Sequence, residues 1–241
     1  MEYRDHLRRE GVALLIGAQS AGIDAPVDAC PGWDIGRLTS HTARVLQRTT
    51  VVVAEGLSEP PDNDRFERLA RDETLFDQYS EILDELIEAL FAADPDAPSW
   101  NFTGENLTNA FWQRRMTHEV AIHRWDAEIA GGHAAEFPTD LAVDGIDELL
   151  TVLLPMSAAR KESTLDASFH LHCTDTEGEW LTVFAGGTPS TTREHAKGDL
   201  AVRGPASSLY LWGWNRRSAT ENGLEALGNT DLLESWAGIV P

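Results

Sequence analysis

Two histidines and a glutamate are spaced so that they could bind one metal ion. His41 lies on the apolar stripe that Leu38 and Val45 form along a predicted helix. Glu119 and His123 are four residues apart in a second predicted helix, so their side chains project from one face. A lone inward histidine is more often a hydrogen-bonded core residue, but a buried carboxylate needs a cation or strong donors. Together the three residues predict a mononuclear metal site with one position open for water or substrate.

The neighbouring His118 does not fit the same ion. The segment HEVAIH resembles the HExxH motif of zinc proteases, but it has one extra residue between the histidines. His118 and His123 are therefore about 140° apart around the helix, at about 100° per residue. This spacing makes Glu119 a predicted ligand instead of a general base, and leaves His118 a flanking residue. Asp126 is expected either to orient His123 or to form a salt bridge with an arginine. The ligand set suits Zn²⁺, Fe²⁺, Ni²⁺ or Mn²⁺.

Helical periodicity dominates the first 160 residues. The apolar pattern predicts four long helices joined by polar turns, which is typical of an antiparallel bundle. The helix of the first histidine is expected from 35 to about 55, capped by Asp34. The helix of the other two ligands is expected at about 105–129, and a fifth helical pattern covers 141–159.

The period changes beyond residue 160. Short alternating segments predict strands, followed by two short helices. The strands are expected at 165–173, 180–185, 191–196 and 200–203, and the helices at 204–214 and 231–237. The sequence therefore predicts an α+β protein with a helical metal-binding domain at 1–160 and a small α+β domain at 161–241.

Composition narrows the function classes. The chain has 19 Lys+Arg against 40 Asp+Glu, a net charge of −21, which argues against nucleic acid or an anionic membrane as a partner. No apolar run is long enough to span a bilayer, and the charged first residues lack the core of a signal peptide, so a cytoplasmic location is expected. Cys30 and Cys173 form no CxxC motif and are expected to be reduced. Cys30 is either a packing residue or a reactive thiol.

Three motifs carry a resemblance to a known family. Residues 30–41 follow the pattern CPGW-x4-L-x2-H, and residues 115–126 follow R-x2-HE-x3-HR-x-D. Both resemble motifs of the mycothiol-dependent maleylpyruvate isomerase family, in the DinB-like superfamily of four-helix metalloproteins. Residues 202–213, VRGPASSLYLWG, resemble that family's C-terminal domain, an α+β unit similar to sterol carrier proteins. The motifs occur in the family's order along almost the whole chain.

The resemblance implies a cofactor and a co-substrate. It implies that His41, Glu119 and His123 bind a divalent metal, usually zinc, and that the thiol mycothiol is a co-substrate. A metal ion lowers the pKa of a thiol and would hold it as a nucleophile. Attack on an electrophilic carbon then leads either to isomerisation by addition and elimination or to transfer of the thiol.

Maleylpyruvate carries two carboxylates, which require cationic side chains. The candidates for binding the co-substrates are Arg115, Arg203 and Arg216. Each could instead be a surface or structural arginine, since most arginines are exposed.

Two other functions are compatible with the residues. A zinc-dependent hydrolase would use the same three ligands without a thiol. A non-catalytic protein could hold a small ligand in its C-terminal domain. The expected partners are a small-molecule substrate and a thiol, and the residues do not distinguish a monomer from a homodimer.

Overall fold

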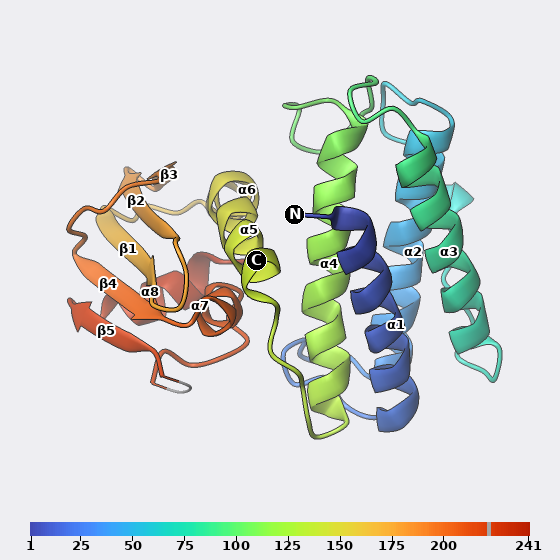
Figure 1. The fold of residues 1–241 in the computed structure, drawn as a ribbon, viewed down its shortest axis with the longest axis horizontal. Helices are drawn as coiled ribbons and strands as arrows, with labels where there is room; N and C mark the ends of the chain where they lie inside the picture. Colours follow the sequence, from blue (N-terminus) through green and yellow to red (C-terminus); the bar gives the residue numbers. More distant parts are fainter. Residues whose placement is uncertain (221–222) are drawn as a thin grey trace. The chain divides into compact units, whose positions relative to one another are not determined.

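The chain forms two compact units. The computed structural model describes residues 1–220 and 223–241, which divide into Met1–Ala135 and Glu136–Pro241 (Figure 1). Among the helices of this described part, none combines the length and the apolar character needed to cross a bilayer.

The division lies 25 residues before the predicted boundary at 160 (160 − 135). The reason is that the fifth helical pattern packs within the second unit. The ring of Phe137 lies 5.1 Å from that of Tyr210, and Trp180 Nε1 donates a hydrogen bond to Asp147 Oδ1 at 3.1 Å. Residues 136–160 therefore share their core with the sheet.

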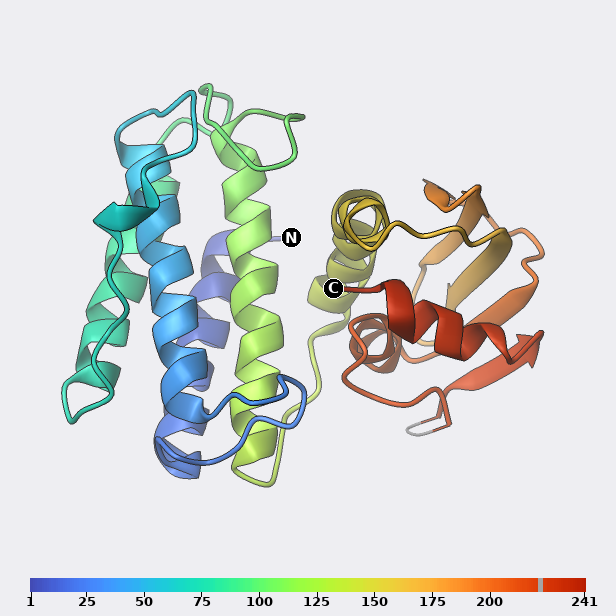
Figure 2. The same ribbon diagram turned by 180° about the vertical axis from the view of Figure 1, so that it is seen from behind.

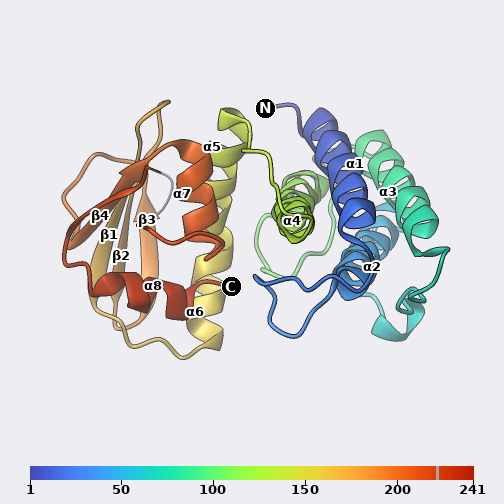
Figure 3. The same cartoon turned by 90° about the horizontal axis from the view of Figure 1, so that it is seen from below.

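The first unit is a bundle of four long helices, as predicted (Figure 3). They are α1 (Tyr3–Ala21), α2 (Ile35–Ala54), α3 (Leu75–Ala92) and α4 (Asn109–Ala130), with a 3-10 turn, η1 (Asn63–Arg65), between α2 and α3. Helix α1 packs mainly against α4, and α2 packs mainly against α3. Leu14, Leu38 and Leu86 are among the aliphatic side chains that fill the centre. Burial of this apolar surface, at about 25 cal/mol per Å², drives the helices together.

Local signals explain where α2 begins. The Asp34 side chain accepts a hydrogen bond from the backbone N–H of Arg37 at 2.8 Å, which caps the helix as predicted. The preceding loop turns at Gly32, whose φ of 78° favours glycine. The loop and the cap together fix the rotation of α2, and with it the direction of His41.

The second unit places helices on a mixed five-stranded sheet. Its helical elements are α5 (Thr139–Glu148), a π-helical turn η2 (Leu149–Leu153), α6 (Leu154–Arg160), α7 (Ala206–Gly213) and α8 (Leu232–Ile239). Its strands are β1 (Ala167–Cys173), β2 (Glu179–Ala185), β3 (Thr188–Thr192), β4 (Leu200–Gly204) and β5 (Glu225–Gly228). The strand order is β3-β2-β1-β4-β5, with only β1 and β4 parallel. The sequence pattern did not predict β5, and it predicted the third strand to begin three residues too late.

The sheet has one face covered by helices (Figure 2). Phe169 on β1 lies 5.1 Å from the ring of Trp236 on α8, which stacks on Trp212 of α7 at 4.9 Å. Residues that alternate with Phe169, such as His170 and His172, point to the opposite face. The segment 193–199, which leads from β3 at one edge to β4, passes over that face, where His195 contacts Glu179.

Candidate metal centre

The structure brings His41, Glu119 and His123 together. Their nitrogen and oxygen donors all lie within 4.8 Å of one another. Helix α2 supplies His41, and the adjacent α4 supplies the other two from one face. His41 Nε2 lies 3.6 Å from Glu119 Oε1, and His123 Nε2 lies 3.5 Å from the same oxygen. The convergence agrees with the helical spacing, but His41 is half-buried, not buried, with 39% of its side chain exposed.

These separations fit a shared ion better than direct hydrogen bonds. Normal N–H···O hydrogen bonds measure about 2.7–3.2 Å. Donors arranged tetrahedrally about 2 Å from one ion lie about 3.3 Å apart. Both imidazoles present Nε2 toward Glu119, and the two rings meet at 83° with centroids 5.5 Å apart. The donor set and its spacing therefore suit a divalent metal ion held by His41, Glu119 and His123, with room for a further ligand.

Asp126 orients His123 by contacting the ring nitrogen that does not face Glu119. The Nδ1–H of His123 donates to Asp126 Oδ2 at 3.0 Å, and Asp126 is fully buried. This contact fixes the tautomer that leaves Nε2 facing Glu119. Of the two roles open to Asp126 from the sequence, the structure shows the contact with the histidine.

The charges of the centre reinforce one another. Burial alone would raise the pKa of Glu119, but the nearby imidazoles of His123 and His41 and the charge of Arg115 hold it well below its ordinary value. Burial alone would lower the pKa of His123, but Asp126 and Glu119 raise it to about 9. Without a metal ion, the centre therefore combines an ionised carboxylate with a protonated imidazole near neutral pH.

The three predicted arginines occupy different places. Arg115 Nη2 donates to Glu119 Oε2 at 3.2 Å, so it supports the ligand carboxylate from the side away from the histidines. Arg203, on β4, pairs with Glu225 at 2.6 Å, and Arg216 donates to the carbonyl of Trp214 at 2.9 Å. Their binding of a co-substrate stays a prediction.

An arginine-rich pocket beside His41 was missed by the sequence analysis. It measures about 300 Å³, and its lining consists of Trp33, Arg37, Ser40, His41, Arg44, Arg68, Leu69 and Arg71. Arg37 and Arg44 precede and follow His41 at helical spacing, so this half could have been found from the sequence. Arg68 and Arg71 come from an irregular segment before α3, whose path no periodicity reveals. Four arginines around one pocket give it a positive lining that suits an anionic ligand, although the protein as a whole is acidic.

The loop of the first motif connects these parts. The indole of Trp33 lies 4.8 Å from the His41 ring, and the guanidinium of Arg37 stacks over it at 4.9 Å. Cys30 Sγ lies 3.9 Å from Asp126 Oδ2. The motif thus contacts His41 through Trp33, and it contacts Asp126, the hydrogen-bond partner of His123, through Cys30. His118 is not among the residues whose donors converge.

Comparisons with known proteins agree with this architecture. The family model of the mycothiol maleylpyruvate isomerase N-terminal domain matches residues 4–128, and the MDMPI C-terminal domain matches residues 140–235. The crystal structure of a mycothiol-dependent maleylpyruvate isomerase is 14% identical with a TM-score of 0.63, covering 93% of this chain and 91% of that chain. A histidine-to-alanine mutant of a mycothiol-dependent maleylpyruvate isomerase matches over the same shares, at 13% identity and a TM-score of 0.62. No curated protein was found to match.

Proposed function

The chain belongs to the mycothiol-dependent maleylpyruvate isomerase family, and from this premise we propose that it is a metal- and thiol-dependent isomerase of a small anionic electrophile. The thiol is mycothiol, and the metal is a divalent ion, for which zinc is the candidate that the family resemblance implies. The observation that carries the proposal is the set of three donors, with both histidine nitrogens 3.5–3.6 Å from Glu119 Oε1, beside a pocket lined by four arginines.

Each residue of the centre has a separate task. His41, Glu119 and His123 would hold the ion, which when bound supplies a positive charge that lowers the pKa of a thiol. Asp126 keeps the His123 ring in place, and Arg115 adds to the effect of His123 and His41 in keeping Glu119 ionised. The half-exposed edge of His41 faces the arginine pocket, so a substrate held there would lie next to the centre.

The arginine pocket would bind the carboxylates of the electrophile. Arg68 is the best candidate, because no hydrogen bond or ion pair engages it within residues 1–220 and 223–241. Arg71 is already paired with Asp24 and Asp34, and Arg44 donates to backbone carbonyls. A free guanidinium can form a bidentate contact with an incoming carboxylate.

Isomerisation follows from addition and elimination. The electrophile accepts the thiol sulfur at one carbon of its conjugated double bond, and the π electrons move to the carbonyl. Rotation about the resulting single bond, followed by loss of the sulfur, restores the double bond in the other geometry. The thiol is returned unchanged, whereas in an S-transferase it would remain in the product.

The test is turnover of maleylpyruvate by the zinc-loaded protein with and without mycothiol. We expect isomerisation that needs the thiol, and mass spectrometry should recover the thiol unmodified. His41→Ala should remove the activity, and His133→Ala, which changes an exposed histidine of the same unit, should retain it. Retention of the thiol in the product would make the protein an S-transferase. Hydrolysis of a model ester without any thiol would overturn the proposal.

A further inference from the structure

A second cluster of metal-ligand side chains lies in the other unit, on the face of the sheet away from the helices. His170 and His172 are two residues apart on β1, so both point to this face. Glu179 on β2 is the direct partner of His172 in the antiparallel register, which places its carboxylate beside them. The sequence analysis singled out none of these residues, because only the strand pairing brings them together.

The fourth member arrives on the crossover segment. Residues 193–199 connect β3 to β4 and carry His195 over β1. Gly198 makes this close approach possible, because a Cβ there would lie 2.8 Å from the backbone nitrogen of His170. Asp199 anchors the end of the segment by accepting hydrogen bonds from the backbone and side chain of Ser168 at 2.8 and 2.7 Å. The position of His195 is therefore set by the sheet below it. The sequence pattern predicts a strand at 191–196, but β3 ends at Thr192.

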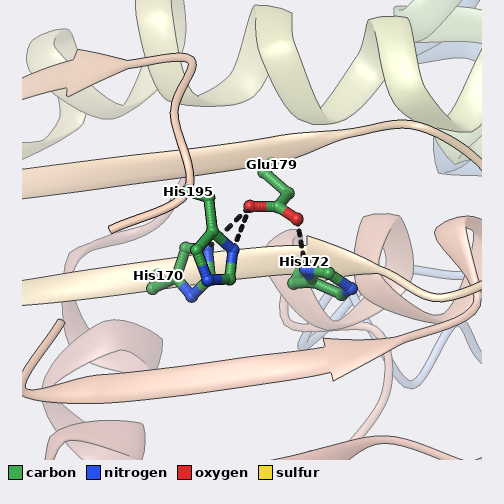
Figure 4. Close-up of side chains that lie close together, drawn as sticks. All are labelled: His170, His172, Glu179 and His195. Carbon is green, nitrogen blue, oxygen red and sulfur yellow. Dashed lines mark hydrogen bonds and ion pairs between the residues drawn. The ribbon is translucent and has the colours of Figure 1, made fainter. Parts of the chain in front are cut away.

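The four side chains face one centre (Figure 4). Their donor atoms all lie within 4.8 Å of one another. His172 Nδ1 and His195 Nδ1 contact separate oxygens of Glu179 at 2.6 Å each, and His170 Nε2 lies 3.5 Å from the same carboxylate. The three imidazole centroids are 5.3–6.1 Å apart.

Hydrogen bonding does not satisfy the whole cluster. His170 Nε2 is buried and has no hydrogen-bond partner in the described chain, although it points into the cluster. An imidazole nitrogen can offer a lone pair to a metal ion, so a bound ion would give this buried atom the partner that it lacks.

We propose that His170, His172, Glu179 and His195 form a second divalent metal site, which takes Zn²⁺ or a similar transition-metal ion. Three imidazoles and one carboxylate match the preference of such ions for nitrogen with an anionic oxygen. The two contacts of 2.6 Å need to open by only about 0.7 Å to reach the donor spacing of a tetrahedral site. Bound metal would then fasten segment 193–199 to β1 and β2.

The surroundings allow an ion to enter. A shallow pocket of about 520 Å³ borders His170 and His195, and its other walls include Lys197 and Asp199. His195 has 78% of its side chain exposed, so the ion need not displace any core residue. Arg203, opposite His172 on β4, is paired with Glu225 at 2.6 Å, which reduces its repulsion of a cation.

The two sites share no residue and lie in different units, so this inference does not depend on the proposed function. The test uses the full chain, purified without a histidine tag, stripped with a chelator and titrated with Zn²⁺. We expect two equivalents in the wild type and in His133→Ala. His195→Ala and His41→Ala should each bind one, and the double variant should bind none.

The pattern of stoichiometries separates the two proposals. One equivalent in the wild type that His41→Ala removes and His195→Ala leaves would overturn the sheet site. One equivalent with the opposite dependence would overturn the bundle site. Because His195 is exposed, its replacement should not unfold the protein, and Glu179→Gln provides an isosteric second variant. As a further readout, Zn²⁺ should slow amide hydrogen exchange in 193–199 of the wild type but not of His195→Ala.

Discussion

Both clusters of histidine and carboxylate side chains use one carboxylate as their centre, but they are held in different ways. In the helical bundle, every donor projects from a long helix, and the nitrogens stand 3.5–3.6 Å from Glu119. On the sheet, two donors come from one strand, one from its neighbour and one from a connecting segment, and two imidazoles rest on Glu179 at 2.6 Å. The bundle cluster is thus already spaced for an ion, whereas the sheet cluster must open.

The difference suggests different tasks. Rigid helices, a buried support at Asp126 and an adjacent anion pocket are what a catalytic centre requires. An exposed histidine on a connecting segment is better suited to a site that fastens that segment to the sheet. The comparison can be tested by changing matched residues in the two clusters.

Substitution of the two central carboxylates, Glu119 and Glu179, is expected to have the largest effect. Glu119→Gln should remove thiol-dependent turnover and one equivalent of zinc, because the amide keeps the shape but loses the charge that binds the ion. Glu179→Gln should remove the other equivalent and leave turnover close to that of the wild type. Steady-state kinetics and metal analysis of both variants check this contrast. Loss of turnover in Glu179→Gln would show that the clusters do not have separate tasks.

Substitution of Asp126, which accepts a hydrogen bond from His123, should have the next largest effect. Asp126→Asn should lower zinc affinity or turnover by about 10–100-fold, since residues that orient metal ligands contribute on this scale. Asp28→Asn, which changes an exposed carboxylate of the loop before α2, serves as the control. Competition with a chromophoric chelator measures the affinity. An unchanged Asp126→Asn variant would remove the positioning role from Asp126.

The arginine pocket should affect substrate binding alone. Arg68→Ala should raise KM for the anionic electrophile by about three- to tenfold, a modest factor because Arg68 is exposed to solvent. The kcat, the zinc content and the affinity for the thiol should not change, and Arg68→Lys should recover part of the loss. An equal rise of KM in Arg4→Ala, a surface arginine of α1, would contradict a specific contact.

The pH dependence of zinc binding should differ between the clusters. Zinc must displace a proton from His123, whose pKa is raised to about 9, mainly by Asp126 and Glu119 against the effect of burial. The affinity of the bundle site should therefore rise by up to about tenfold per pH unit from 7 to 9 and then level off. In the sheet, burial lowers the pKa of His170, so this histidine adds no such rise above pH 7. Titrations of His195→Ala and His41→Ala isolate the two sites, and equal slopes would contradict this assignment.

The titration of His123 also affects the stability of the metal-free protein. The pKa of His123 in the folded protein, about 9, lies above its ordinary value of 6.5, so the stabilisation is fully present below about pH 6.5 and is lost as pH rises through 9. His123→Ala, compared with the wild type by chelator-treated thermal unfolding, should lose this dependence.

The smallest expected effect is that of His195→Ala on the melting temperature of the metal-free protein. His195→Ala should move the melting temperature by less than about 2 °C in the presence of a chelator, as is usual for an exposed side chain. Added Zn²⁺ should stabilise the wild type more than this variant. Calorimetry of the two proteins measures the difference, and equal stabilisation by Zn²⁺ would argue against a metal at the sheet.

Helical spacing was enough to predict that His41, Glu119 and His123 converge. Because residues four apart share a helix face, Glu119 and His123 could be paired from the sequence, and His118 could be set aside. Only half of the arginine pocket could be predicted from the sequence, since Arg68 lies in a segment without periodicity. The sheet cluster needed strand register and a crossover path, which depend on contacts between distant residues such as Gly198 and His170. The unit boundary was misplaced because a helical pattern does not reveal which core the helix joins.

The most direct test of the central claim is the visible spectrum of Co²⁺ bound to Glu179→Gln, in which only the bundle site should remain. Added mycothiol should produce a saturable sulfur-to-cobalt charge-transfer band, with a stoichiometry of one thiol per chain. The band should be absent when His41→Ala is added to the same background. A spectrum that mycothiol does not change, or a band that survives His41→Ala, would contradict a thiol-binding metal centre at His41, Glu119 and His123.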